Sequence, residues 1–188
     1  MDLFKISILN KILKLSNKSI LEKKILEKSK QPGRFVSNLG GYQSHNLDIE
    51  DQDLKELITK LNTEVSHLAN YYEFKDELKV KEIWFNTNRY KDFNAVHYHK
   101  DSIFSGVYYF DVPENTGGIV FRNPTINYMD LYWPNHIIKE HNNMNTPTWE
   151  IHPVTDQVLI FPAWLEHSVN PNMNKNKDRI SMSFNFHY

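Results

Sequence analysis

Cysteine is absent from the sequence, which excludes disulfide bonds and thiolate metal sites. Histidine, aspartate and glutamate are therefore the strong metal ligands that remain available. Long apolar runs are also absent, since lysines interrupt the apolar positions near the N-terminus. No stretch approaches the roughly 18 apolar residues of a membrane-spanning helix, and none has the pattern of a secretory signal peptide. These absences lead us to expect a cytoplasmic protein without a membrane span.

Internal repeats and low-complexity tracts are absent as well, and the composition is typical of a soluble globular protein. Apolar residues make up 40% and charged residues 24% of the sequence, which argues against an intrinsically disordered chain. The chain has 188 residues, and this length predicts a single domain with one well-filled core.

The net charge of -1 conceals a basic N-terminal segment, because residues 1–34 contain nine Lys/Arg against three Asp/Glu. The rest of the chain is acidic, which argues against a main domain that binds the phosphates of nucleic acids. We interpret the basic segment as a solvated helix face. A contact with an acidic partner or a membrane surface is the alternative.

Helical patterns dominate the first 75 residues. Apolar side chains recur at three- and four-residue spacings over residues 3–15, which predicts an amphipathic helix. Ser19 and Glu22 have the spacing of a capping box, so a second short helix is expected to begin there. A third helix is predicted over residues 51–72, with one apolar face. We expect residues 1–75 to form a mainly helical support.

Strand patterns follow in residues 78–188. Five short runs alternate in polarity or are rich in aromatic and β-branched residues: LKVKEIWFNTN, SGVYYFDV, GGIVFRN, DQVLIFPA and RISMSFNF. Since no helical pattern separates them, they indicate an antiparallel sandwich or barrel. Residues 126–148 are interpreted as a long loop. The predicted fold class is α+β, with helices first and a β-rich half after them.

Two histidines and an aspartate alternate in the segment HYHKD. Side chains two residues apart on a strand face the same way, so His97, His99 and Asp101 could point to one side. His167 follows an apolar strand later in the chain and could supply a ligand from a second strand. A non-haem iron site needs three protein ligands on one face, with open positions opposite. A short alternating triplet is a weak signal by itself, because polar alternation at a strand edge is common.

A second cluster strengthens the signal. Arg179 follows His167 by twelve residues, and Arg179 and Ser181 lie on one face of a predicted strand. Arginine presents a planar fork that matches a carboxylate, and a hydroxyl two residues along can add a hydrogen bond. A surface ion pair between Arg179 and Asp178 is the alternative interpretation.

This arrangement resembles the 2-oxoglutarate and Fe(II)-dependent oxygenase superfamily, and most closely a group of short members of it. The likeness runs with gaps from residue 37 to the C-terminus, over the segments SNLGGYQS, NAVHYH, SGVYYFDVPENTGGIVFRNP, LIFPAWLEHSVNPN and RISMSFNF. The resemblance implies a double-stranded β-helix, which is a jelly roll related to the cupins, with the metal in its mouth. It also implies Fe(II) as cofactor and 2-oxoglutarate as co-substrate.

The resemblance further implies a ligand set. The short group has His-x-His where its relatives have His-x-Asp, which gives His97, His99 and His167 as iron ligands. Asp101 stays open as an alternative ligand, or as an acceptor that orients a ligand histidine. A three-histidine site would lack an anionic ligand.

By the same resemblance, Arg179 and Ser181 would bind the far carboxylate of 2-oxoglutarate. Asn94 lies in the segment that leads to the histidines, and Tyr108 or its neighbour Tyr109 could hydrogen-bond the co-substrate. For Asn94 and the tyrosines, packing in the core is the alternative.

The expected function is that of a dioxygenase that hydroxylates a small-molecule or polymer-attached substrate with release of succinate and CO2. Dioxygen is the other reactant. Two alternatives keep the fold: a cupin-like metal-binding module, and a cupin enzyme that needs no 2-oxoglutarate. The oligomeric state stays open, with a homodimer as one alternative.

Overall fold

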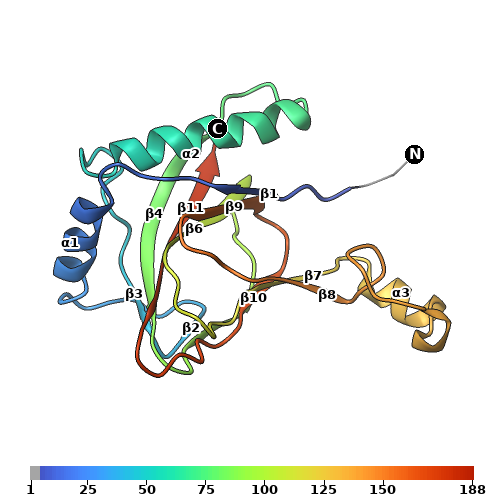
Figure 1. The fold of residues 1–188 in the computed structure, drawn as a ribbon. Helices are drawn as coiled ribbons and strands as arrows, with labels where there is room; N and C mark the ends of the chain where they lie inside the picture. The colour runs from blue at the N-terminus through green and yellow to red at the C-terminus, as the bar shows by residue number, and fades with distance from the viewer. Residues whose placement is uncertain (1–4) are drawn as a thin grey trace.

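The computed structural model describes residues 5–188, and within them the strands form two antiparallel sheets (Figure 1). The larger sheet has the order β1 (Leu9–Ile12), β9 (Gln157–Pro162), β6 (Phe104–Asp111), β11 (Arg179–His187), β4 (Lys79–Asn88) and β3 (Tyr42–Gln43). The smaller sheet has the order β2 (Asn38–Leu39), β5 (Phe93–His97), β10 (His167–Val169), β7 (Ile119–Arg122) and β8 (Thr148–Ile151). Side chains of both sheets line one cavity of about 390 Å³. The expected double-stranded β-helix is confirmed.

Strand β11 separates the core from the cavity, because successive side chains of a strand point to opposite faces. Its even-numbered side chains enter the main core, namely Ile180, Met182, Phe184 and Phe186. Its odd-numbered side chains line the cavity, namely Arg179, Ser181, Ser183 and Asn185. Strand β4 does the same beside it, with Ile83 and Phe85 in the core and Trp84 and Asn86 at the cavity.

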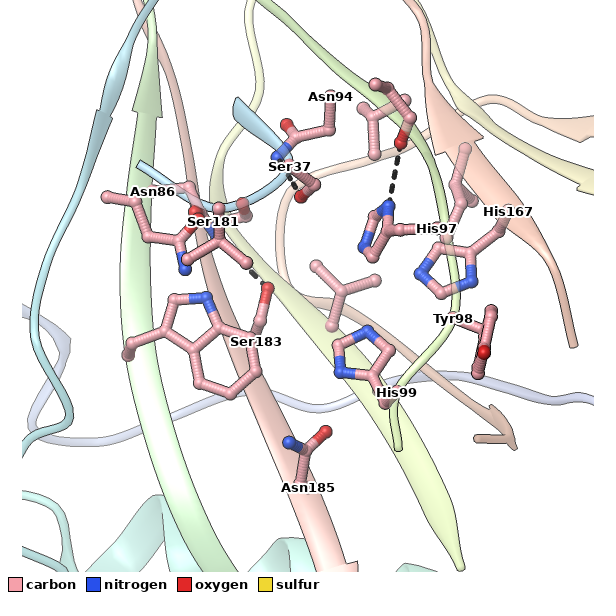
Figure 2. Close-up of a pocket in the computed structure, with 18 of the residues that line it drawn as sticks. Ser37, Asn86, Asn94, His97, Tyr98, His99, His167, Ser181, Ser183 and Asn185 are labelled. Atoms are coloured by element: carbon pink, nitrogen blue, oxygen red, sulfur yellow. Dashed lines mark hydrogen bonds between the residues drawn. The ribbon is translucent and has the colours of Figure 1, made fainter. Parts of the chain in front are cut away.

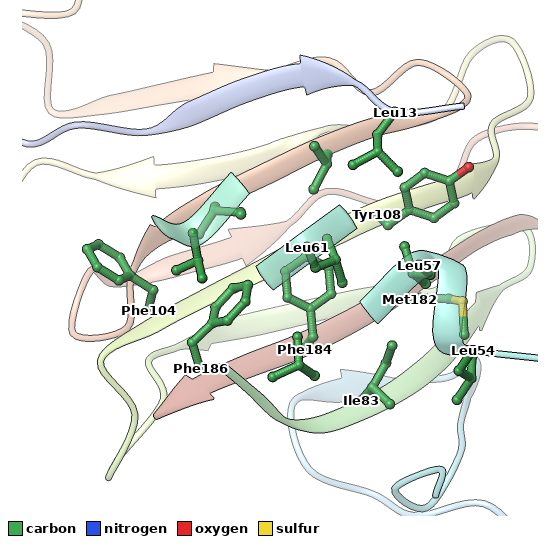
Figure 3. Close-up of a cluster of buried hydrophobic side chains, with 14 of the residues drawn as sticks. Leu13, Leu54, Leu57, Leu61, Ile83, Phe104, Tyr108, Met182, Phe184 and Phe186 are labelled. Atoms are coloured by element: carbon green, nitrogen blue, oxygen red, sulfur yellow. The ribbon is translucent and has the colours of Figure 1, made fainter. Parts of the chain in front are cut away.

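Helix α2 (Lys55–Tyr71) covers the outer face of the larger sheet (Figures 1 and 3). Leu57, Leu61 and Val65 on this helix are fully buried against the core side chains of the sheet. Burial of each such side chain stabilises the fold by about 1.5–3 kcal/mol. The helix predicted over residues 51–72 is confirmed. Its apolar face packs against the face of the larger sheet that is opposite the cavity.

The helix predicted over residues 3–15 is wrong for the part that the structure describes, because Leu9–Ile12 forms strand β1 on the edge of β9. Residues 1–4 lie outside the described residues. Ile6 and Ile8 pack against the smaller core cluster, while Leu9 and Leu13 pack against the larger one. Pairing with the free edge of β9 therefore overrides the helical spacing of the apolar residues.

The second predicted helix exists as α1 (Lys18–Lys28), but its expected capping box is wrong. The residue at the N-cap is Asn17, which makes no side-chain capping bond. Its Nδ2 instead donates to the backbone oxygen of Asp53, 2.7 Å away. A tertiary contact thus sets the start of α1.

The five strands predicted in the second half are confirmed as β4, β6, β7, β9 and β11. Residues 126–148, expected to be a loop, contain the short helices α3 (Ile126–Tyr132) and η1 (Asn135–Ile137). Figure 1 shows this segment extending away from the two sheets. Within residues 5–188, no helix is both long and apolar enough to cross a membrane.

Candidate metal centre

Three histidines of the cavity lining converge (Figure 2). His97 ends β5, His167 begins β10, and the two are paired across the ladder between these strands. His99 follows β5, where its backbone N–H donates to the oxygen of Ala163, 2.9 Å away. One ring nitrogen from each histidine lies within 4.8 Å of the others. This spacing lets a single metal ion contact all three rings.

Backbone carbonyls fix two of the rings. Nδ1 of His97 donates to the oxygen of Ala95 at 2.7 Å, and Nδ1 of His167 donates to the oxygen of Leu165 at 2.8 Å. A carbonyl oxygen only accepts, so Nδ1 carries the proton and Nε2 is left with its lone pair. Histidine ligands of metals are commonly held in this way. Both rings are therefore oriented for coordination through Nε2.

The three imidazoles are neutral at physiological pH. Burial, together with the positive charge that His97 would carry, lowers the pKa of His167 to about 3. Burial and His97 likewise lower the pKa of His99 to about 4, and burial lowers the pKa of His97. Metal ions bind the neutral form, so the site offers three ready nitrogen donors without competition from protons.

Arg179 begins β11 and is 1% exposed. Its Nη1 donates to Oγ1 of Thr116 and to the backbone oxygens of Gly117 and Asn170, at 3.2, 2.6 and 3.1 Å. Its Nη2 is buried and has no hydrogen-bond partner among the described residues. This burial excludes the surface ion pair with Asp178. The cavity thus holds a buried cationic nitrogen that lacks an acceptor, which is costly unless an anion binds there.

Polar side chains line the cavity between Arg179 and the histidines. Ser181 and Asn94 both line it, as expected from the sequence. Nδ2 of Asn94 donates to Oγ of Ser37, 3.1 Å away (Figure 2). Nδ2 of Asn86 donates to Oγ of Ser183 at 3.0 Å, while Oδ1 of Asn86 is buried without a partner among the described residues. The cavity therefore offers donors and acceptors along its length.

Asp101 does not join the histidines. It is exposed, has a φ of 60° and lies in a turn beyond the end of β5. The described group of candidate metal ligands contains only the three histidines. The common face extends past β5 to His99, whose backbone is held by Ala163, but it ends in the turn at residues 100–101, where the positive φ of Asp101 breaks the alternation of side chains.

Tyr108, a candidate contact of the co-substrate, does not line the cavity. It packs in the main core (Figure 3), and its hydroxyl donates to Oδ1 of Asp156, 2.7 Å away. Tyr109 lines the cavity instead and pairs with Ser181 across the ladder between β6 and β11. Adjacent tyrosines on one strand face opposite ways, and the sequence did not indicate which one faces inward.

The sequence patterns did not single out several residues of the cavity. Glu82 and Arg34 line the cavity, and the ring of Trp84 stacks on His99 with centroids 6.0 Å apart. No residue of the segment 126–148 lines the cavity.

The donor set fits a divalent first-row transition metal such as Fe(II), because imidazole nitrogen suits these ions. The buried, unpaired Nη2 of Arg179 fits a carboxylate in the same cavity. These two features together fit a metal ion and an anionic molecule bound side by side.

Comparison with protein families gives one match. The model of the family described as "Putative 2OG-Fe(II) oxygenase" matches residues 82–185. The matched range contains the three histidines, Arg179 and Ser181. A search of the curated proteins by sequence found no match.

Solved structures share the fold. A prolyl-4-hydroxylase of Pseudomonas putida is 13% identical with a TM-score of 0.64, and covers 99% of this chain and 95% of its own. A viral collagen prolyl hydroxylase from Paramecium bursaria chlorella virus-1, solved with 2OG, is 14% identical with a TM-score of 0.61. The match covers 95% of this chain and 94% of the viral chain. An alpha-ketoglutarate-dependent epimerase from nogalamycin biosynthesis is 13% identical with a TM-score of 0.67. The match covers 97% of this chain and 78% of the epimerase chain.

Proposed function

The chain belongs to the 2OG-Fe(II) oxygenase family, and we propose that His97, His99 and His167 hold its iron while Arg179 and Ser181 hold its 2-oxoglutarate. It is thus an oxidoreductase that uses Fe(II), 2-oxoglutarate and dioxygen. The residue roles rest on the geometry of the cavity, because the family alone does not say which side chains act in this chain.

The iron ligands are supported by the three nitrogens that lie within 4.8 Å of one another. The exposed place of Asp101 in the turn argues against Asp101 as a direct ligand. Three protein nitrogens on one side of an ion leave the opposite positions open for 2-oxoglutarate and dioxygen.

The buried guanidinium of Arg179 is the observation that carries the assignment of the co-substrate site. Its Nη1 is fixed by three acceptors, and its Nη2 lacks one. A carboxylate at Nη2 would complete the hydrogen bonds of the buried cation. Ser181 is the next residue along β11 that faces the cavity, and its hydroxyl can donate to the same carboxylate.

When bound, iron and 2-oxoglutarate supply an oxidation in which dioxygen converts the keto acid to succinate and CO2 and oxidises a second substrate. We propose hydroxylation of a C–H bond as the outcome. The chain's own part is to orient the three imidazoles and to place the keto acid against them through Arg179. The apolar side chains within the lining, such as Ile119, Phe161 and Val169, help to exclude water.

Arg34, Tyr98 and Lys100 also line the cavity, and we propose that they contact the substrate. These side chains come from the loop before β2 and from the turn after β5, so loops rather than the sheets would select the substrate. The cytoplasmic location, the lack of a nucleic-acid preference and the homodimer alternative stay predictions.

A metal-binding module without 2-oxoglutarate is the rival function. It is not favoured, because such a module has no use for a buried arginine fork in the metal cavity. Anaerobic titration of the Fe(II)-loaded protein with 2-oxoglutarate separates the two. Chelation of the iron by the keto acid produces a visible charge-transfer band, and the absence of this band in an iron-loaded sample would contradict the proposed function.

A further inference from the structure

The loop before β2 contributes a second arginine, Arg34, to the cavity lining. The backbone N–H of Arg34 donates to the oxygen of Gln43 on β3, and the N–H of Ala95 on β5 donates to the oxygen of Ser37, both at 2.8 Å. Oγ of Ser37 also accepts from the side chain of Asn94, as Figure 2 shows. The loop is thus anchored to the larger sheet at one end and to the smaller sheet at the other.

The guanidinium of Arg34 is held over an aromatic ring. Its Cζ lies 5.2 Å from the centroid of the Trp84 ring, and its Nη2 donates to Oδ1 of Asn46 at 2.9 Å. Nδ2 of Asn46 donates in turn to Oε1 of Glu82 at 3.2 Å. Because an arginine only donates and a carboxylate only accepts, these two partners fix the orientation of the Asn46 amide. The arginine is therefore positioned before any ligand binds.

Arg34 has hydrogen-bonding capacity that the chain does not use. Among residues 5–188, Nη2 is the one guanidinium nitrogen with an acceptor, and Nε is buried without a partner. No carboxylate of these residues forms an ion pair with Arg34. Burial lowers the pKa of Arg34, and the charge of Glu82 opposes this effect, but an arginine stays protonated in a protein. An anion in the cavity would offset the cost of this partly buried cation.

The charges of the lining also favour an anion. The charged side chains other than histidine among the described lining residues are Arg34, Lys100, Arg179 and Glu82. The single carboxylate is already satisfied, because Glu82 accepts from Asn46 and also from Nδ2 of Asn185 at 2.6 Å. In the proposed function, Arg179 binds the far carboxylate of 2-oxoglutarate. Arg34 and Lys100 then remain for a different anion.

Trp84 links this arginine to the candidate metal centre. Its ring stacks on that of His99 with centroids 6.0 Å apart, and the guanidinium of Arg34 lies over the same tryptophan. An anion bound to Arg34 is therefore about one indole ring away from His99. A small molecule can span this distance and still present another of its atoms to the metal.

We propose that Arg34 binds an anionic group of the substrate, either a carboxylate or a phosphate. This inference rests on the proposed function, because it requires that 2-oxoglutarate occupies Arg179. Carboxylates and phosphates match the planar donor pattern of a guanidinium, so the contact orients the substrate as well as holding it. Arg34 thus selects substrates by charge, and the C–H bond that is oxidised belongs to a molecule with a negative group.

A purely structural role, in which Arg34 only supports Trp84, is the rival explanation. Two probes of similar shape separate the two: phenylacetate, which is an anion, and phenylacetamide, which is neutral. Phenyl phosphate tests phosphate as the anionic group. Each probe is titrated by calorimetry into anaerobic protein that is loaded with Fe(II) and saturated with 2-oxoglutarate, so that Arg179 is occupied.

The variants are Arg34→Gln, which removes the charge, and Arg34→Lys, which keeps the charge without the fork. The matched control is Arg122→Gln on β7, which removes an exposed arginine that pairs with Glu166 outside the cavity. We expect wild type to prefer at least one anion over phenylacetamide, and Arg34→Gln to bind that anion roughly tenfold or more weakly. Arg34→Lys should lie between them, and Arg122→Gln should match wild type.

Equal binding of the anions by wild type and Arg34→Gln would overturn the inference, as would a wild type that binds neither anion more tightly than phenylacetamide. If Arg34→Gln does not fold, Arg34→Lys decides, because an affinity equal to that of wild type would show that the fork makes no contact. The charge-transfer band with 2-oxoglutarate keeps the two proposals apart. A normal band without discrimination between the probes contradicts the role of Arg34 alone, whereas no band in wild type contradicts the proposed function, and the inference falls with it.

Discussion

His97 and His167 are direct partners in the ladder between β5 and β10, and their ring centroids are 4.3 Å apart. Two segments far apart in the sequence thus meet through backbone pairing before any metal binds. A preformed site of this kind loses little conformational entropy on binding the ion. The cavity is therefore expected to bind metal in the folded protein without a rearrangement of the strands.

The first prediction concerns the ligand set. His97→Ala, His99→Ala and His167→Ala should each lower the affinity for Fe(II) by more than about 100-fold, since loss of a direct ligand exceeds the effect of losing an orienting residue. Iron content after anaerobic reconstitution measures this. Asp101→Asn is the control and should retain full iron content, and a loss of iron in that variant would restore Asp101 as a ligand.

The second prediction concerns Arg179. Arg179→Lys keeps a positive charge but cannot form the same fork, so 2-oxoglutarate should bind more weakly by about 1.5–3 kcal/mol. Titration of the charge-transfer band gives the Kd. Fe(II) affinity should stay unchanged, because Arg179 does not belong to the metal cluster. Unaltered 2-oxoglutarate binding in a folded Arg179→Lys variant would refute this role.

The third prediction contrasts two neighbouring tyrosines. Tyr108→Phe removes the buried hydroxyl that donates to Asp156, so the free energy of unfolding should fall by about 1 kcal/mol with no change in 2-oxoglutarate affinity. Denaturant unfolding and the band titration measure both quantities. A weakened 2-oxoglutarate complex in Tyr108→Phe, with Tyr109→Phe unaffected, would reverse the assignment of the two faces of β6.

The fourth prediction concerns acid stability. The ammonium of Lys60, with hydrogen bonds from Ser16, lowers the pKa of Glu56 from 4.5 to about 2. Because the folded pKa lies below the unfolded one, this carboxylate stabilises the fold above pH 4.5, and the stabilisation is lost as the pH falls from 4.5 towards 2. Urea unfolding of wild type and Glu56→Gln between pH 6 and 3 measures the effect. The two curves should converge at the acidic end, and a constant difference would argue against linkage to Glu56.

The sequence predicted those features that depend on local patterns. The alternating runs gave β4, β6 and β11, and the apolar face gave α2. The same alternation placed Arg179 and Ser181 on one face, because β11 is a long, regular strand. The assignment of these residues to the co-substrate remains a prediction, as does the role of the histidines.

The features that the sequence did not predict depend on pairing between distant segments. Strand β1 forms because β9 offers a free edge, which no local pattern reveals. The contact between Glu82 and Asn185 depends on the register of β4 against β11, which is set by the whole sheet. The turn at residues 100–101, which no local pattern indicated, likewise places Asp101 outside the site.

Because β11 supplies side chains to both the core and the cavity, its length cannot change without disrupting both. A single inserted or deleted residue within Arg179–His187 would exchange the two faces of the strand from that point onward. Phenylalanines would then fill the cavity, and serine, asparagine or arginine would enter the hydrophobic core between the sheet and α2. Substitutions can be tolerated one position at a time along this strand, but changes in length must be confined to the connections, such as residues 170–178.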